Sequence, residues 1–247
     1  MQVSAAVGPD FYSGRGPWVV SGRDDTLVFV SRATMHAASV PSEDHVALLQ
    51  KALARGWRGS GTIATRLTSF FQELHSLLVA QTAATDVHPA NRGWHIEICA
   101  AAIEPGSVWV IHVADHRVWR VRGERVDRLT VDCTLGEDAK RIGTSVSERL
   151  AGVVTRVLGY EAQQAPAPIV VSRHDLAAGD VLVLTSGWFH RDTPEEAAET
   201  LIRRAGAIPD AETAARFLLA ERVASLNTFP HAVDYQLAST GVLVVHP

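Results

Sequence analysis

The sequence has few of the features that mark disulfide-stabilised, membrane-spanning or nucleic-acid-binding proteins. Only 2 of its 247 residues are cysteines, which is too few for a disulfide framework, and the histidines show no paired spacing that indicates a zinc site. The longest apolar runs fall far short of the roughly 20 residues that span a bilayer. The formal net charge is −4 with no lysine- or arginine-rich run, so we expect binding to neither nucleic acid nor membranes.

Hydrophobic residues make up 47% of the chain, which is enough to build a substantial core. The first ten residues lack a basic stretch followed by an apolar one, so we expect a cytoplasmic protein. The alanine-, proline- and glutamine-rich stretch at 161–168 is too short to separate domains. We therefore predict a single domain over residues 1–247.

Unbroken apolar runs predict strands that are buried on both faces, at residues 27–30, 108–113, 181–184 and 242–245. Two further strands are expected at 96–103 and 18–21. A hairpin is expected at 117–121 and 125–129, because Gly123 lies in the turn between them, and we expect it to continue strand 108–113 as a meander.

Capping residues and helical periodicity predict helices among these strands. They are expected at 43–55 with Ser42 as cap and Gly56 as stop, at 62–81, from Ser145 to Gly159, from Pro194 to Gly206, and at 211–226 behind Asp210. Strand blocks interrupted by helices predict an α+β fold, in which two antiparallel sheets are flanked by helices in a four-layer α/β-β/α sandwich.

The sequence SVWVIHVADHRVWRVRGERVDRLTVDCTL, at 107–135, is similar to a strand, turn and hairpin of the metal-dependent protein phosphatases (PPM, type 2C). Further resemblance lies in LVFVSRATMHAASVPSEDHVALLQKAL, TRVLG, LAAGDVLVLTSGWFH and the closing STGVLVV. The matches follow the order of that family along nearly the whole chain. The resemblance implies a protein phosphatase 2C-like fold.

The resemblance also implies hydrolysis of phosphoserine and phosphothreonine by a water that bridges two Mg²⁺ or Mn²⁺ ions, which need carboxylate ligands. The Asp-Gly pair of the family falls on Ser31 and Arg32. Its Ser-Asp-Gly segment places the metal-binding aspartate on Ser186 and keeps the glycine as Gly187. The sequence thus lacks two of the carboxylates that the resemblance leads one to expect.

The other motif positions of the family are only partly matched in this sequence. The final Asp-Asn pair falls near residues 238–239, or on Asp234 if four residues are inserted. Arg15 could occupy the arginine position of the early motif. Asp115 clearly keeps a family acid, although alone it is most simply a turn residue.

These replacements favour a catalytically degenerate pseudophosphatase that needs no cofactor and acts by binding a protein partner, such as a phosphoprotein or a Ser/Thr kinase. A guanidinium at Arg32 would repel the cations. The alternative is an active Ser/Thr phosphatase with a non-standard Mg²⁺ or Mn²⁺ site made from Asp115, Asp234 and either Asp24 or Asp25. A purely structural or oligomerisation module is the third hypothesis.

The residues that could bind phosphate or a partner near the expected cleft are Arg15, Arg32, His36, Trp188, His190 and Arg191. A salt bridge for Arg32 and a structural hydrogen bond for His36 are the simpler interpretations. His112 and His231 lack a third ligand for a histidine-based metal centre. No recognisable motif places a histidine and an acid beside Ser31 or Ser186, so neither is predicted to be a nucleophile.

Overall fold

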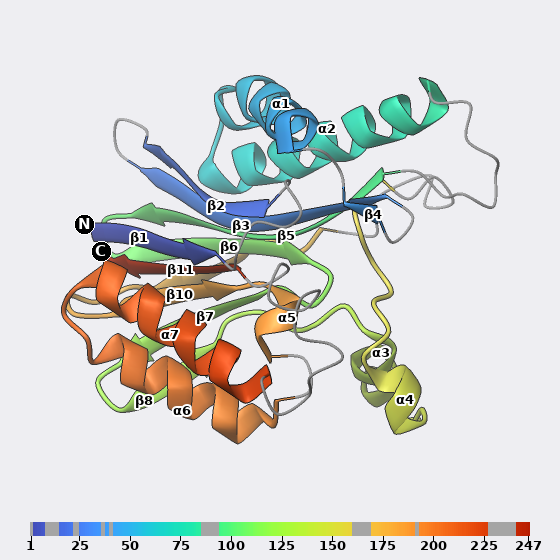
Figure 1. Cartoon of the computed structure of the whole chain (residues 1–247). Coiled ribbons are helices and arrows are strands. Elements are labelled where there is room, and N and C mark those ends of the chain that lie inside the picture. Colours follow the sequence, from blue (N-terminus) through green and yellow to red (C-terminus); the bar gives the residue numbers. More distant parts are fainter. Residues whose placement is uncertain are drawn as a thin grey trace.

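Two antiparallel sheets lie face to face, with helices on their outer sides (Figure 1). The computed structural model describes residues 2–7, 15–21, 25–35, 38–39, 42–84, 94–159, 169–190, 193–226 and 241–247. Within these ranges the structure confirms the predicted α+β fold of two helix-flanked antiparallel sheets. No helix of the described part has both the length and the apolar composition needed to cross a membrane.

One sheet has five strands, which lie in the order β1 (Gln2–Val7), β11 (Gly241–His246), β10 (Val181–Thr185), β7 (Arg117–Arg122) and β8 (Arg125–Arg128). The other has the order β2 (Arg15–Ser21), β3 (Thr26–Met35), β5 (Trp94–Glu104), β6 (Ser107–Val113) and β9 (Ser172–Asp175), and the short β4 (Ala38–Ser39) pairs with β3. β1 and β9 were not predicted from the sequence.

The helices cover the outer face of each sheet. α1 (Ser42–Ala52), a π-helical turn (Leu53–Trp57) and α2 (Ile63–Ala84) lie on the six-stranded sheet, whereas α6 (Glu195–Gly206) and α7 (Ala211–Leu226) lie on the five-stranded one (Figure 1). Three short helices, α3 (Leu135–Arg141), α4 (Glu148–Ala151) and α5 (Gly187–His190), lie near one end of the sandwich (Figure 1).

Successive side chains of β3 point alternately into two hydrophobic clusters. Leu27 and Phe29 pack in the cluster with α1 and α2, whereas Val28 and Val30 pack between the two sheets. All four side chains are buried. This confirms the prediction of a strand covered on both faces, and it fixes which face each following residue of β3 takes.

The predicted meander from strand 108–113 into the hairpin is wrong. β6 pairs with β5 and β9 in one sheet, whereas β7 pairs with β8 and β10 in the other. The chain crosses between the sheets at residues 114–116, where Ala114 has the positive φ of 66°. A corner and a hairpin turn look alike in the sequence, because both are short and polar.

The helix predicted from Ser145 to Gly159 is also wrong, since only α4 forms there. The apolar residues that suggested it are extended, and two of them form isolated β-bridges: Val154 with Thr134, and Leu158 with Ile96. Their apolar spacing arises from contacts with distant strands, so local periodicity misreads it.

Several boundaries differ from the prediction by a few residues, and two of them have a clear physical cause. β3 continues through Met35 instead of ending near Val30, because its second half pairs with β5. The helix expected to stop at Gly56 continues as a π-turn to Trp57, and Gly56 lies against the backbone of Phe70 in α2. Gly56 therefore serves close helix packing rather than helix termination.

Candidate functional site

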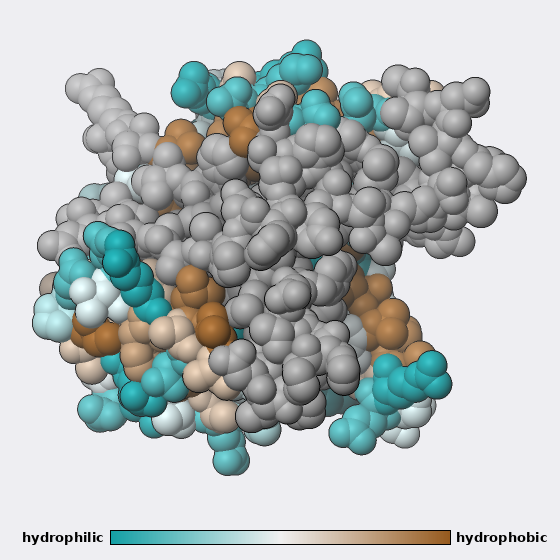
Figure 2. Space-filling model, viewed as in Figure 1, coloured by the Kyte–Doolittle hydropathy of each residue, from teal (hydrophilic) through white to brown (hydrophobic). Residues whose placement is uncertain are grey.

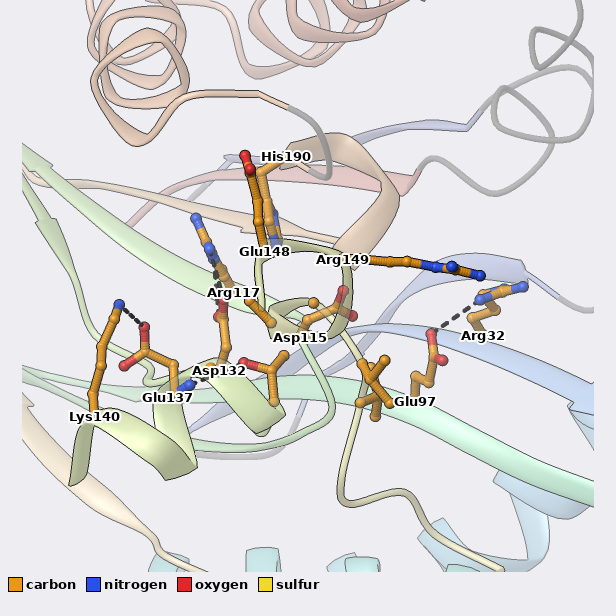
Figure 3. Close-up of a pocket in the computed structure, with 16 residues that line it drawn as sticks. Arg32, Glu97, Asp115, Arg117, Asp132, Glu137, Lys140, Glu148, Arg149 and His190 are labelled. Atoms are coloured by element: carbon orange, nitrogen blue, oxygen red, sulfur yellow. Dashed lines mark hydrogen bonds and ion pairs between the residues drawn. The ribbon is translucent and has the colours of Figure 1, made fainter. Parts of the chain in front are cut away.

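A polar cavity of about 1000 Å³ opens between β3, β5, the β6–β7 turn and the segment that carries α3 and α4 (Figure 3). Its charged lining residues come from distant parts of the chain: Arg32, Glu97, Asp115, Arg117, Asp132, Glu137, Lys140, Glu148 and Arg149. His190 of α5 lines it as well.

An ion pair between Arg32 and Glu97 forms one wall of this cavity. Arg32 Nη1 lies 3.2 Å from Glu97 Oε2, and the two residues are directly opposed in the β3–β5 register. Both side chains are buried. The salt-bridge interpretation of Arg32 is thus confirmed, and its partner Glu97 was not identified from the sequence.

Ser31 lies on the opposite face of β3 from Arg32. Its hydroxyl lies 3.2 Å from Nε2 of His45 in α1, and both side chains are buried. Neither Ser31 nor His45 lines the cavity, so the structure brings a histidine beside this serine only within the sheet–helix core. The residue of this segment that faces the cavity is Arg32.

Asp115 and its neighbour His116 occupy the corner where the chain changes sheets. The Asp115 carboxylate lies directly over Cα of Gly187, so closely that a Cβ at position 187 would overlap it. His116 Nδ1 is 3.8 Å from Asp115 Oδ1, and the imidazole is completely buried. Candidate metal-ligating atoms of Glu97, Asp115 and His116 all lie within 4.8 Å of one another.

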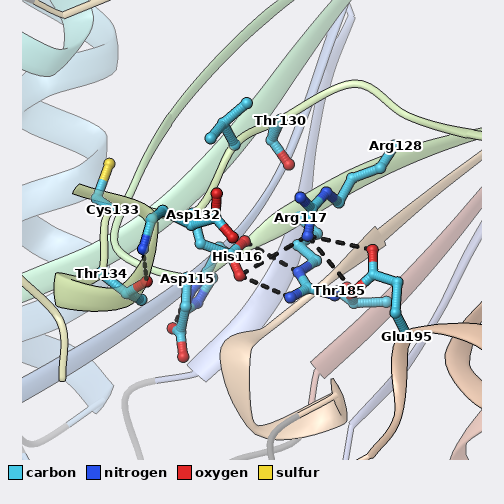
Figure 4. A network of polar contacts seen from close by, with 12 residues as sticks. Asp115, His116, Arg117, Arg128, Thr130, Asp132, Cys133, Thr134, Thr185 and Glu195 are labelled. Carbon is cyan, nitrogen blue, oxygen red and sulfur yellow. Dashed lines mark hydrogen bonds and ion pairs between the residues drawn. The ribbon is translucent and has the colours of Figure 1, made fainter. Parts of the chain in front are cut away.

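A network centred on Arg117 stabilises the neighbouring wall (Figure 4). Its Nε and Nη2 donate to the two carboxylate oxygens of Asp132 at 2.9 and 2.6 Å, and Nη1 donates to Glu195 at 2.8 Å. Burial alone would lower the pKa of Arg117, but the bonds to these carboxylates raise it above its ordinary value. Arg117 is therefore a fixed structural cation.

The other predicted site residues divide into those the structure describes and those outside the described ranges. His190 and Ser186 are buried at α5, and His190 lines the cavity. Trp188 is described only as part of α5, and Arg15 only by its backbone, which pairs with Arg32 in the β2–β3 register. Outside the described residues lie Asp24, His36, Arg191, His231 and Asp234.

Asp25 does not line the cavity. It precedes β3 and pairs with Arg66 of α2. Six residues of extended chain separate it from Ser31, which is about 20 Å of strand.

A second cavity of about 670 Å³ lies beside the first and shares lining residues of α3 with it. His112 and Cys133 line it, with Cys133 Sγ 4.0 Å from His112 Nε2, and the His112 ring bonds the carbonyl of Val131. Burial lowers the pKa of His112 and raises that of Cys133. This arrangement keeps both groups neutral and serves to pack the loop.

The donors in the first cavity do not suit a pair of Mg²⁺ or Mn²⁺ ions. Such hard ions take oxygen ligands, chiefly carboxylates, and two of them would bring four positive charges to this wall. Five carboxylates line the described part of this cavity, and three of them, Glu97, Asp132 and Glu137, are paired with Arg32, Arg117 and Lys140. Ser31 and Ser186 add no negative charge where the family motifs have aspartates.

Comparison with solved structures identifies the fold. The chain resembles the Ser/Thr phosphatase PstP/Ppp of Mycobacterium tuberculosis (16% identity, 98% of this chain and 96% of that one, TM-score 0.68) and Stp1 of Staphylococcus aureus (11% identity, 98% and 92%, TM-score 0.74). It also resembles the catalytic domain of PstP in complex with two manganese ions (18% identity, 98% and 96%, TM-score 0.68). No protein-family model and no curated protein sequence matches the chain.

These similarities show that the chain has the fold of the PPM-type Ser/Thr phosphatases. The expectation drawn from the sequence motifs is thereby confirmed at the level of the fold. At this level of identity the fold does not by itself assign an activity, because activity depends on the residues of the site.

Proposed function

We propose that this protein is a pseudophosphatase, which uses a PPM-type fold to bind a phosphoprotein rather than to hydrolyse it. The observation that carries the proposal is the Arg32–Glu97 ion pair in the cavity wall. A unit charge 4 Å from a guanidinium is repelled by about 4 kcal/mol at an effective dielectric constant of 20, and each divalent ion carries twice that charge. Two such ions are therefore disfavoured beside Arg32.

Arginine chemistry supports phosphate as the ligand. Arg149 of α4 lines the cavity, and in Figure 3 its guanidinium points toward that of Arg32. Among the described residues, Arg149 has no ion-pair partner, whereas Arg117 and Lys140 are held by carboxylates. A guanidinium without a carboxylate partner suits a phosphate, because its planar fork donates two parallel hydrogen bonds.

The rim of the cavity supports a protein as the source of that phosphate. Leu150 and Val153, in the wall segment around α4, are 47% and 45% exposed. Figure 2 shows hydrophobic side chains beside the polar ones in this part of the molecule. Apolar side chains exposed around a polar hollow are typical of a surface that contacts another protein. A phosphorylated Ser/Thr kinase is one partner with this chemistry.

Calorimetric titration with a phosphothreonine peptide and its unphosphorylated form, without added Mg²⁺ or Mn²⁺, tests this proposal. We expect saturable binding of the phosphopeptide alone, weakened about tenfold in Arg149→Gln, because a charge-assisted hydrogen bond contributes about 1.5 kcal/mol. Arg141→Gln is the matched control, since Arg141 lines the second cavity only. Equal binding of both peptides, or equal loss in both variants, would contradict the proposal.

The second candidate is an active phosphatase with an unusual metal set, and Asp115 in the cavity wall is the observation that favours it. Of the other carboxylates expected for this alternative, Asp234 lies outside the described residues, and Asp25 is paired with Arg66 away from the cavity. Turnover measurements distinguish the two functions directly.

A further inference from the structure

His116 is the least explained polar side chain in the described part of the molecule. Its side chain has no solvent exposure, and neither ring nitrogen makes a hydrogen bond with another described residue. A buried imidazole without such a bond destabilises the folded state, because its polar atoms have lost their hydrogen bonds to water. A ligand that binds the ring would remove this cost.

The surroundings of His116 indicate the kind of ligand. A ring nitrogen of His116, a carboxylate oxygen of Asp115 and one of Glu97 all lie within 4.8 Å of one another, and all three residues are buried. These groups come from different places: Glu97 from β5, and the other two from the corner between the sheets. The fold itself therefore brings three ligating groups to one point.

A tetrahedral zinc site would draw these ligand atoms closer together. Zinc bonds of about 2.0–2.2 Å place neighbouring ligand atoms about 3.4 Å apart. The separation of 3.8 Å between His116 Nδ1 and Asp115 Oδ1 would shrink by a few tenths of an ångström, and the other pairs, which lie within 4.8 Å, by up to about 1.4 Å. Glu97 and Asp115 also line the cavity, so the open fourth position of an ion held there would face the hollow.

We propose that Glu97, Asp115 and His116 form a binding site for one Zn²⁺ ion. This inference goes beyond the proposed function and beyond the phosphatase motifs, in which a serine stands at the position of His116. A nitrogen ligand favours zinc over Mg²⁺, which binds almost entirely through oxygen.

The charges of the wall are consistent with one ion and not with two. Two carboxylates balance the two positive charges of a single Zn²⁺, and Arg32 leaves one excess positive charge in the wall. Arg32 also holds the Glu97 carboxylate from the side, as partners of metal-ligating carboxylates commonly do.

Zinc titration of chelator-treated full-length protein tests the site. We expect one Zn²⁺ per chain by calorimetry, binding at least about tenfold weaker in Glu97→Gln and in His116→Gln, and no change in the control His174→Gln, because His174 bonds Ser172 away from the cluster. Visible absorption of bound Co²⁺ gives a second readout, which is also expected to be lost in Glu97→Gln.

If His116→Gln does not fold, the histidine ring NMR signals of the wild-type protein test the site instead. One imidazole that shifts on addition of one equivalent of Zn²⁺ in the wild type, and does not shift in Glu97→Gln, is the expected result, because it places a histidine in the same site as Glu97. The proposal is overturned if no saturable zinc binding occurs, if both variants bind zinc as the wild type does, or if two Mn²⁺ ions bind in preference to one Zn²⁺.

Discussion

Arg32 Nη1 and Glu97 Oε2 lie 3.2 Å apart across the β3–β5 pair, with only 7% and 8% of their side chains exposed. These two residues are 65 positions apart in the chain. The pair places a cation and its counter-charge inside the wall of the polar cavity. This ion pair therefore contributes both to the stability of the six-stranded sheet and to the charge of the cavity wall.

Glu97→Ala is expected to lower the free energy of unfolding by about 3–5 kcal/mol, because it leaves the Arg32 guanidinium buried without its carboxylate. The double variant Arg32→Met/Glu97→Met should recover most of that loss, since it removes both charges and fills similar volume. Urea unfolding measures both. Arg55→Ala is the control, because the Arg55–Glu73 pair is exposed, and it should change stability by less than about 1 kcal/mol. A Glu97→Ala loss as small as the control's would contradict this account.

Gly187→Ala is expected to displace the Asp115 carboxylate and to destabilise the protein by about 1–3 kcal/mol, because the added methyl group would overlap that carboxylate. The matched control is Gly152→Ala, where a methyl group meets nothing within 4 Å and φ is −83°. Thermal unfolding of the two variants should separate them clearly. If both unfold at the wild-type temperature, Asp115 does not lie where the structure places it.

Gly56→Ala tests the contact between the π-turn and α2. We expect a loss of at least about 2 kcal/mol, because the methyl group would overlap the backbone of Phe70, which cannot move as a flexible side chain can. A stabilising effect, as expected for glycine replacement within an ordinary exposed helix, would be inconsistent with this packing. Chemical denaturation measures the difference.

Stability is expected to fall as the pH is lowered from 7 to 5, in part through His75. Burial lowers the pKa of His75 below 6.5, and its Nδ1 accepts a hydrogen bond from the Gly159 N–H at 3.1 Å. The unfolded chain therefore takes up a proton first, so the contribution is complete above pH 6.5 and is lost as the pH falls toward the folded-state value. One such group contributes at most about 1.4 kcal/mol per pH unit.

Urea unfolding across this pH range should show a smaller slope in His75→Gln than in the wild type. His112 and His174 also have a pKa lowered chiefly by burial, so part of the slope should remain in the variant. An unchanged slope would mean that His75 is not held neutral in the folded protein.

Much of the fold was predictable because its strands are apolar runs with clear ends, such as Val181–Thr185. The sheet to which each strand belongs was not predictable. The chain passes from one sheet to the other at Ala114, which has a positive φ. The apolar residues around Val154 were misread as a helix because their partners lie far away in the sequence.

Only some residues of the candidate site could be identified from the sequence. Arg32 and Asp115 could be found because they fall within recognisable motifs. Glu97 could not, because a lone glutamate in an apolar strand gains its meaning only from pairing with Arg32. The sequence shows that His116 lies next to Asp115. Its complete burial and its closeness to Glu97 follow only from the tertiary structure.

We propose that the cavity lacks metal-dependent phosphatase activity. Hydrolysis of a phosphothreonine peptide by the purified protein, with millimolar Mn²⁺ and with chelator, tests this proposal, beside an Asp115→Asn control that detects contaminating phosphatase. We expect no Mn²⁺-dependent turnover above that of the control. Turnover that requires Mn²⁺ and disappears in Asp115→Asn would contradict it and would establish a working metal site built on a different set of carboxylates.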